Sequence, residues 1–474
     1  MEILLVTPEL SPFTRGSDAG DTVAALAKHL RHLGHEITIL LPRYPGLEAQ
    51  GLLLARRLSP LVLPSGVEVS VLDGRLPSGV KLVALDAPLL FDRAGVYGEE
   101  LSLYPDNAQR FGLLAQAAVA LVRQHQDHGA RFDIVQLNDW PGALVPLLLQ
   151  GESDVSVPTV LTVHDVRQQG SFPLSELRSL GATEENAESL MLGGQLNVLK
   201  SGLLLASAVT TVSDAYAEGF VEPDQSGELA TFIAQSKGVL GINNGVDYAL
   251  FNPAADPLIV SRFDAEDPTN KQRNKSAVLL ERGLTLQPGR PLVAVWADPR
   301  EAESLKLLSD ALLLVLKHDL SLIIASPLLL DDPRLVEMAT RFPEVCALHS
   351  NADEAARHRL LAGADIYLST DTSRLASMLP VVAQRYGAVP VALATPRTVD
   401  QVVDTDVDLL TGTGFLYDEA SPTALVGALE RALGAFASPK WATLRRRVMR
   451  LDISWDRPVR RYLQVFRQAL APRA

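Results

Sequence analysis

Polar and ionisable side chains gather in the predicted turns that join a buried strand to the following helix. In sheets of parallel strands such turns line the carboxyl edge, where α/β proteins bind their ligands. These turns offer carboxylates, a histidine and arginines, so they could hold a charged or polar ligand and act on it. The turns comprise residues 10–21, 136–142, 163–170, 297–304, 369–378 and 394–400.

The sequence lacks the patterns of several common chemistries. It contains no HExxH, no clustered histidines and aspartates, and no cysteine spacing that would predict a metal site. No GxGxxG follows the first predicted strand, so dehydrogenase chemistry is unsupported. We therefore expect neither a metal nor a cofactor.

The elements that carry these turns alternate between strands and helices. The first such unit runs from "EILLVT" through the helix "DTVAALAKHLRHLG" to "EITILL", and the pattern recurs along the chain. The strands are apolar throughout, which is typical of parallel sheets covered on both faces. A second series begins near Pro291, after the polar segment 264–275. The sequence predicts an α/β protein with two doubly wound, Rossmann-like parallel-sheet domains facing a central cleft, with their boundary between Asn243 and Lys275.

Composition limits the classes of protein to consider. The chain has 474 residues, a formal net charge of -13 and one cysteine, Cys346. An acidic chain disfavours nucleic acids and anionic membranes as partners, and a single cysteine excludes an internal disulfide framework. The longest apolar region is interrupted by Lys317, His318 and Asp319, so it falls short of a membrane span. We expect a cytoplasmic protein.

Ordered motifs extend over nearly the whole chain. Through them the chain resembles bacterial glycogen synthases and plant starch synthases, the GT-B glycosyltransferases that add glucose from ADP-glucose or UDP-glucose to an α-1,4-glucan. The resemblance implies an acceptor-side amino domain over residues 1–250, a nucleotide-sugar domain over 251–455, and a last helix, 456–474, that packs back on the amino domain. The motifs are "SPF", "LPRYP", "YPDNAQRF", "NDWPGAL", "TVHD", "LKSGLLLASAVTTVSDAYA", "NNGVD", "FNPAADPLI", "RYGAVPV", "TGF" and "ISWDRPVRRYL".

The acceptor side keeps several residues that match the family. By resemblance, Asp139 and His164 occupy active-site positions, Tyr97 matches an aromatic residue of the acceptor region, and Asn244 matches a residue near the donor. The family's "HAHDWH" is "QLNDWP" in this chain, so three histidines are absent. For His164 there is also a structural interpretation, a buried histidine that is hydrogen-bonded at the end of a strand.

The first donor motif departs from the family. A diphosphate needs cations and backbone amides around it, and the family supplies amides through a loop of the type KTGGLGD. The matching segment is "RGSDAGD", in which Arg15 can stand for the lysine and Asp21 is kept, but Asp18 and Ser17 replace glycines. A carboxylate would then lie on the approach of the phosphates, unless Asp18 is simply a turn or cap residue.

The second donor motif, of the type SRLxxQKG, inverts its charges. Aligned from "PLVAVW", its arginine position is Asp298 and its lysine position is Glu303. Each pair of unit charges at 4 Å is worth about 4 kcal/mol at an effective dielectric constant of 20, so two reversals predict a large loss of donor affinity. Arg300 and Lys306 lie nearby, but their spacing of six residues does not match the family's five.

The third donor motif, of the type EPCGL, loses its carboxylate. Counted back from "RYG", the glutamate position is Arg374, and the family's TGG turn is "TPR", beginning at Thr395. A cation at the start of a helix opposes the helix dipole, so we expect Arg374 to have an anionic partner, with Asp298 or Glu303 as the candidates. The alternative is that these are three unrelated surface charges.

These departures favour a non-catalytic member of the family. Its role would be to bind an α-glucan or to regulate an active enzyme of glycogen metabolism. One alternative is an active retaining glucosyltransferase that extends an α-1,4-glucan from ADP-glucose or another nucleotide sugar. The other is a structural interaction protein that binds neither donor nor glucan.

Overall fold

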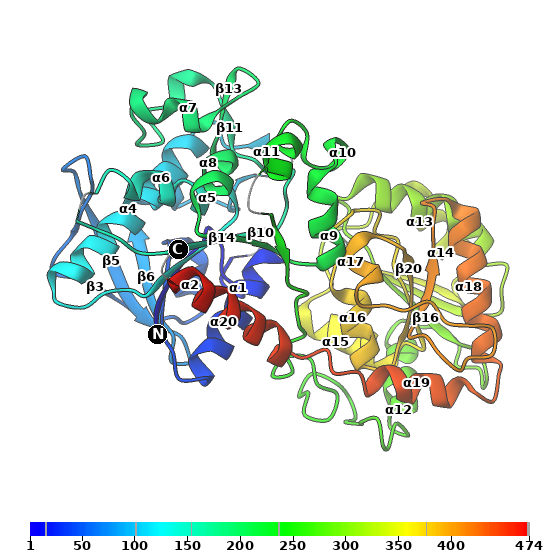
Figure 1. Ribbon diagram of the computed structural model, residues 1–474. Helices are drawn as coiled ribbons and strands as arrows, with labels where there is room; N and C mark the ends of the chain where they lie inside the picture. Colours follow the sequence, from blue (N-terminus) through cyan, green and yellow to red (C-terminus); the bar gives the residue numbers. More distant parts are fainter. Residues whose placement is uncertain (15–16, 100–101, 153, 236–237, 376, 472–474) are drawn as a thin grey trace. The chain divides into compact units, whose positions relative to one another are not determined.

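The structure, a computed structural model, describes residues 1–14, 17–99, 102–152, 154–235, 238–375 and 377–471 (Figure 1). The chain divides into two compact units. Unit 1 comprises Met1–Asn244 and Trp455–Ala474, and unit 2 comprises Gly245–Ser454. The last segment of the chain therefore belongs to the unit that contains the first.

Unit 1 is built around a sheet in the order β15-β14-β10-β9-β1-β2-β6-β5-β3, with β4 also paired to β5. The strands from β15 to β6 are parallel, whereas β5 runs antiparallel to β6 and to β3. The strands of this sheet are β1 (Glu2–Val6), β2 (Glu36–Pro42), β3 (Leu54–Arg56), β4 (Leu61–Val62), β5 (Glu68–Arg75), β6 (Lys81–Asp86), β9 (Ile134–Asn138), β10 (Thr159–Val163), β14 (Ala208–Thr211) and β15 (Leu240–Gly241).

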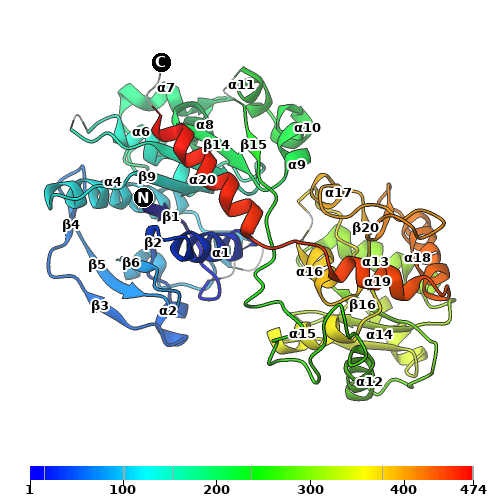
Figure 2. The same ribbon diagram turned by 60° about the horizontal axis from the view of Figure 1, so that its bottom comes forward.

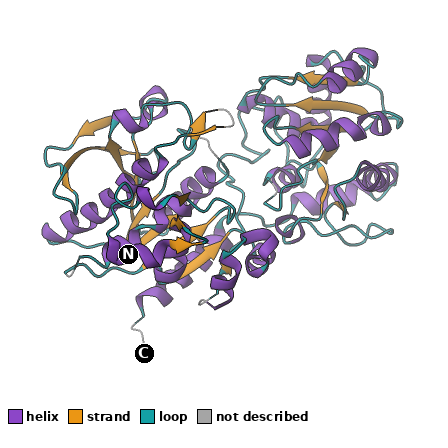
Figure 3. Ribbon diagram, turned by 90° about the horizontal axis from the view of Figure 1, so that it is seen from above, coloured by secondary structure: helices purple, strands orange, loops and turns teal. Residues whose placement is uncertain are grey.

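Helices cover the strands of unit 1, and short hairpins extend from it (Figure 3). The longer helices are α1 (Ala19–His32), α4 (Asn107–Asp127), α8 (Val198–Leu205), α11 (Leu229–Gln235) and α20 (Asp456–Leu470). The shorter ones are α2 (Pro45–Ala49), α3 (Pro88–Phe91), α5 (Asp139–Ala143), α6 (Val145–Leu149), α7 (Ala187–Leu190), α9 (Asp214–Glu218) and α10 (Pro223–Ser226). The hairpin strands are β7 (Gly98–Glu99), β8 (Ser102–Leu103), β11 (Ser171–Phe172), β12 (Met191–Leu192) and β13 (Gln195–Asn197).

Helix α20 packs onto unit 1 beside α1 (Figure 2). Its apolar face, with Tyr462 and Phe466 fully buried, joins the core that also contains Ile3 and Ile39. Apolar residues three and four positions apart form one stripe on a helix, which explains why this face is buried while the arginines of the helix point outward.

Unit 2 has a parallel sheet in the order β18-β17-β16-β19-β20-β21. Its strands are β16 (Leu292–Trp296), β17 (Ser321–Ala325), β18 (Cys346–His349), β19 (Ile366–Leu368), β20 (Val389–Leu393) and β21 (Phe415–Tyr417). Its helices are α12 (Lys271–Glu281), α13 (Ala302–Val315), α14 (Pro333–Arg341), α15 (Glu354–Gly363), α16 (Leu379–Arg385), α17 (Pro396–Val399), α18 (Pro422–Phe436) and α19 (Trp441–Met449).

Apolar clusters lie on both faces of the unit 2 sheet. This explains the uninterrupted apolar strands of the sequence, since neither face meets water. In the part of the chain that the structure describes, each helix is too short or too polar to cross a membrane.

Candidate functional site

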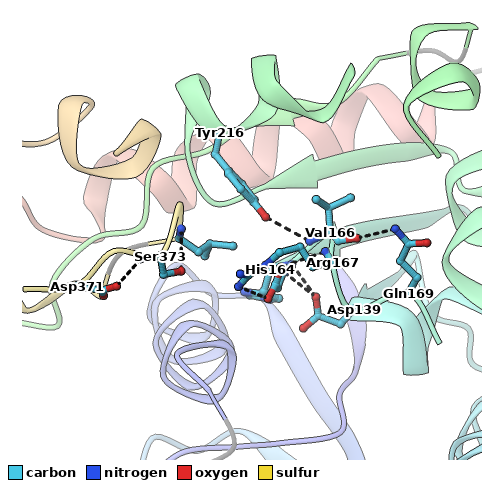
Figure 4. Close-up of polar contacts among 10 residues, drawn as sticks. Asp139, His164, Val166, Arg167, Gln169, Tyr216, Asp371 and Ser373 are labelled. Atoms are coloured by element: carbon cyan, nitrogen blue, oxygen red, sulfur yellow. Dashed lines mark hydrogen bonds and ion pairs between the residues drawn. The ribbon is translucent and has the colours of Figure 1, made fainter. Parts of the chain in front are cut away.

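Asp139 lies at the carboxyl end of β9 and begins α5. Its backbone φ of 52° is in the left-handed region, which aspartate tolerates better than most residues. This conformation turns the buried carboxylate toward the end of the neighbouring strand β10, where Oδ1 accepts the backbone N–H of His164 at 2.6 Å (Figure 4). Burial raises the pKa of Asp139 well above its ordinary value, although the His164 N–H opposes the shift.

His164 is also buried, and its Nε2 lies 3.1 Å from Oδ1 of Asn138. The structure thus brings the predicted residues Asp139 and His164 together, but the contact joins a carboxylate to a main-chain N–H and not to the imidazole. The hydrogen bond at a strand end, which the structural interpretation of His164 anticipated, is present. A role of His164 in an active site stays a prediction.

Aromatic rings surround the next predicted residue, Tyr97. Its ring centroid lies 5.5 Å from that of Phe111 and 6.3 Å from that of Trp140, and Trp140 also packs against Phe172 at 5.5 Å. Burial raises the pKa of Tyr97 well above its ordinary value, and the Glu9 and Asp139 carboxylates raise it further. Apolar ring faces beside a few polar groups are the usual lining of a site for a neutral organic ligand.

Glu9 is a member of this site that the sequence reasoning missed. It follows β1 and is fully buried, and its carboxylate accepts the N–H and the hydroxyl of Ser17, each at 2.8 Å. Its charge contributes to the raised pKa of both Tyr97 and Asp139. Glu9 lies three residues after β1 ends at Val6. It stands just before the turn 10–21, so an earlier start for that turn would have included it.

The predicted residues of the first loop lie around the start of α1. The prediction for Arg15 falls outside the described residues. Asp18 is exposed at the N-cap position, without a side-chain capping hydrogen bond, and Asp21 is exposed in the first helical turn. Asn244 is buried, and its amide donates to the Thr22 hydroxyl at 2.9 Å, which fixes it against the same helix.

In unit 2, Asp298 follows β16 and forms a two-point ion pair with Arg300, with Nε 2.9 Å from Oδ1 and Nη2 2.5 Å from Oδ2. Burial opposes ionisation of Asp298, but the hydrogen bonds from Arg300 outweigh it and lower the pKa of the carboxyl. Glu303 is exposed in the first turn of α13. Lys306 lies 3.5 Å from Asp310, so both nearby cations have carboxylate neighbours.

The turn after β19 contains a carboxylate that the sequence reasoning did not single out. Asp371 accepts the backbone N–H of Ser373 at 2.9 Å through Oδ1 (Figure 4). Its Oδ2 accepts the backbone N–H of Ser377 at 2.7 Å. Arg374 is exposed on the same turn. Its predicted ion pair with Asp298 or Glu303 stays a prediction.

Thr395 is buried at the end of β20 and caps the short helix α17. Its hydroxyl oxygen accepts the N–H of Thr398 at 3.2 Å and lies 2.8 Å from the Thr398 hydroxyl. The capping role accounts for a hydroxyl residue at this position without a ligand.

Comparison with known proteins identifies the family. Residues 2–235 match the family model described as the starch synthase catalytic domain. Over 98% of its length the chain is 34% identical to a glycogen synthase of Aromatoleum aromaticum, covering 96% of that protein. It is 35% identical to a glycogen synthase of Anaeromyxobacter sp. strain Fw109-5, with full coverage of both chains.

The fold agrees with these matches. The catalytic domain of starch synthase IV from Arabidopsis thaliana, solved with ADP and acarbose bound, superposes with a TM-score of 0.87 at 25% identity and covers 99% of both chains. The predicted α/β class and the GT-B assignment are therefore confirmed. The chain belongs to the glycogen and starch synthase family of GT-B glycosyltransferases.

Proposed function

We propose that this glycogen synthase-like glycosyltransferase binds an α-glucan through unit 1 and does not transfer glucose from ADP-glucose or UDP-glucose. Two contacts in unit 2 carry the proposal: Asp371 accepts two main-chain N–H groups of its own turn, and Asp298 holds the guanidinium of Arg300. The main-chain N–H groups and the guanidinium that could bind a diphosphate are thus already bound to carboxylates of the protein itself.

The charges explain why this would prevent donor binding. A diphosphate close to Asp298 would face a carboxylate at a position where the family has a cation. Repulsion between two unit charges at 4 Å is about 4 kcal/mol at an effective dielectric constant of 20, and salt reduces it at exposed positions. Even after that reduction, loss of an attraction and gain of a repulsion would weaken binding by orders of magnitude.

The acceptor side supports the glucan part of the proposal. The rings of Tyr97 and Trp140 lie 6.3 Å apart, and Trp140 adjoins the buried Asp139 in the chain. Burial raises the pKa of Tyr97, and the Glu9 and Asp139 carboxylates raise it further. A structurally similar starch synthase was solved with acarbose, a carbohydrate ligand. Hydrogen-bonding groups beside aromatic faces suit a neutral, hydroxyl-rich chain.

The proposal is tested by calorimetric titration of the whole protein with ADP-glucose, UDP-glucose and maltoheptaose, at low and physiological salt. We expect heat from maltoheptaose and none from either donor up to millimolar concentration. Tyr97→Ala should weaken maltoheptaose binding, whereas Leu89→Ala, at an exposed position of α3, is the matched control. Micromolar donor binding together with glucosyl transfer would refute the proposal.

A second candidate function is an active glucosyltransferase with a rebuilt donor site. It is favoured by Asp139, His164 and Asn244, which keep buried, hydrogen-bonded positions in unit 1. The similar proteins named glycogen synthases also favour it. Incorporation of labelled glucose into maltoheptaose or glycogen separates the two candidates directly.

Without catalysis, the function would be regulatory. The proposal then includes an active enzyme of glycogen metabolism as a partner and a cytoplasmic location. Co-purification of such an enzyme with the tagged chain, lost when maltoheptaose saturates the protein, would link glucan binding to that partnership.

A further inference from the structure

We propose that Arg110 is a positioning residue that fixes the segment 90–97 so that Tyr97 is presented to the glucan. The inference rests on the proposed glucan-binding function. Arg110 belongs to the first turns of α4 and is fully buried. Its links to Tyr97 run through main-chain carbonyls and the side chain of Asn107.

The guanidinium joins the two ends of this segment. Nε donates to the carbonyl of Leu90 at 2.8 Å, and Nη1 donates to the carbonyl of Val96 at 2.8 Å. Between the Leu90 and Val96 carbonyls, α3 ends at Phe91 and the following residues form neither helix nor strand. Without a strand or helix ladder, side-chain hydrogen bonds to the main chain are the means of fixing such a segment.

A second link runs through Asn107 to Tyr97. Nη1 of Arg110 donates to Oδ1 of Asn107 at 2.6 Å, which orients the amide. Nδ2 of Asn107 then donates to the carbonyl of Tyr97 at 2.8 Å, and the N–H of Tyr104 donates to the same carbonyl at 3.0 Å. The position of the Tyr97 backbone thus depends on an amide that Arg110 holds.

Ring contacts complete the arrangement. The guanidinium lies 5.2 Å from the ring centroid of Phe111, and this ring in turn lies 5.5 Å from Tyr97 and 5.0 Å from Trp140. The Arg110 guanidinium also stacks over Tyr104, with its carbon 4.8 Å from the centroid of that ring. A planar guanidinium can stack and donate in fixed directions at the same time, which a lysine ammonium cannot do.

The cost of burying Arg110 argues that it does more than fill space. Burial lowers the pKa of its guanidinium, and among the described residues no carboxylate forms an ion pair with it. An apolar side chain of similar size would pack with less desolvation. What arginine adds is the set of hydrogen bonds, and two of these fix carbonyls of the segment that ends at Tyr97.

The test uses the full chain and compares Arg110→Lys and Asn107→Ala with a matched control, Arg93→Lys. Arg93 lies in the same segment and also donates to a carbonyl, that of Leu89 at 2.9 Å, but it is partly exposed and paired with Asp106. Hydrogen exchange at Val96, Tyr97 and Gly98, maltoheptaose titration and thermal unfolding are measured for each protein.

We expect both test variants to exchange faster at these amides and to bind maltoheptaose about tenfold more weakly, equivalent to the loss of one or two hydrogen bonds. Arg93→Lys should change neither quantity. Since Asn107→Ala keeps the guanidinium, it carries the test if Arg110→Lys does not fold.

The experiment distinguishes failure of the proposed glucan binding from failure of the positioning role of Arg110. Wild-type protein that gives no maltoheptaose signal refutes the proposed function and with it the role in presentation. Folded Arg110→Lys and Asn107→Ala proteins with wild-type affinity and wild-type exchange at Tyr97 refute the positioning role while glucan binding stands. A loss of thermal stability without a change in affinity would likewise reduce Arg110 to a structural residue.

Discussion

The carboxylate of Asp371 accepts the main-chain N–H of Ser377 at 2.7 Å and that of Ser373 at 2.9 Å. An internal anion therefore occupies two N–H groups of the turn that precedes α16. Hydrogen bonds to a charged acceptor are stronger than those between neutral groups, so this turn has a fixed shape before any ligand arrives.

Asp371→Asn should destabilise unit 2 by about 1–2 kcal/mol, because two charge-assisted hydrogen bonds become neutral ones. The measurement is urea unfolding followed by a probe of unit 2. Asp418→Asn, an exposed aspartate of the same unit, is the control and should leave the midpoint unchanged. Equal midpoints for all three proteins would mean that the Asp371 contacts contribute nothing.

Arg374→Glu alone should not create glucosyl transfer. In the motif alignment the substitution restores the carboxylate that the resemblance implies, but Asp298 and Glu303 would still stand at the two positions where the resemblance implies cations. A single reversal then adds a third negative charge to the donor side. Turnover of ADP-glucose by this single variant, measured against the wild type, would overturn our interpretation of the donor site.

The site could be predicted from sequence where the fold itself brings residues together. Asp139 and His164 are far apart in the chain, but each follows a strand, and β9 and β10 are parallel neighbours. The rule that ligands bind at carboxyl ends of strands selected the turns 136–142 and 163–170 that hold them. The motif matches then singled out Asp139 and His164 within these turns, and Tyr97 and Asn244 elsewhere.

Other features depend on contacts that no local pattern encodes. Asp256 and His358 are 102 residues apart in sequence, and their contact arises only when an irregular segment packs against α15. The role of Asp371 likewise follows from the exact path of its turn. Aligning motifs shows which charged residue occupies each position. It does not show with which carboxylate an arginine such as Arg300 forms an ion pair.

His358 should stabilise the protein more at low pH than at high pH. Its Nδ1 lies 2.7 Å from Asp256 and its Nε2 lies 3.3 Å from Glu354. Burial favours the neutral ring, but the hydrogen bonds with the two carboxylates outweigh it and raise the pKa of His358 above its ordinary 6.5. Tyr386 and the stacked ring of Phe251 are its other neighbours.

A raised pKa in the folded state means that folding favours the protonated ring. This contribution is complete below about pH 6.5, the value for an unfolded chain, and is lost as the pH rises through the folded value. The difference in unfolding free energy between wild type and His358→Gln should therefore shrink from pH 6 to pH 9. His128, which is exposed, serves as control through His128→Gln. A difference that grows with pH would contradict the predicted sign.

Removal of a buried tyrosine hydroxyl should change the unfolding free energy differently at Tyr386 and at Tyr44. The Tyr386 hydroxyl donates to Asp256 at 2.5 Å, whereas the Tyr44 hydroxyl has no hydrogen-bond partner among the described residues. Removing the Tyr386 hydroxyl takes one hydrogen bond from a buried carboxylate that keeps His358 and the Leu258 N–H, at a cost of about 1 kcal/mol, while removing an unpaired hydroxyl relieves its desolvation. Tyr386→Phe should thus lower the unfolding free energy, and Tyr44→Phe should leave it unchanged or raise it. Chemical denaturation of the two variants side by side decides the matter, and a larger loss for Tyr44→Phe would show that its hydroxyl is satisfied in solution.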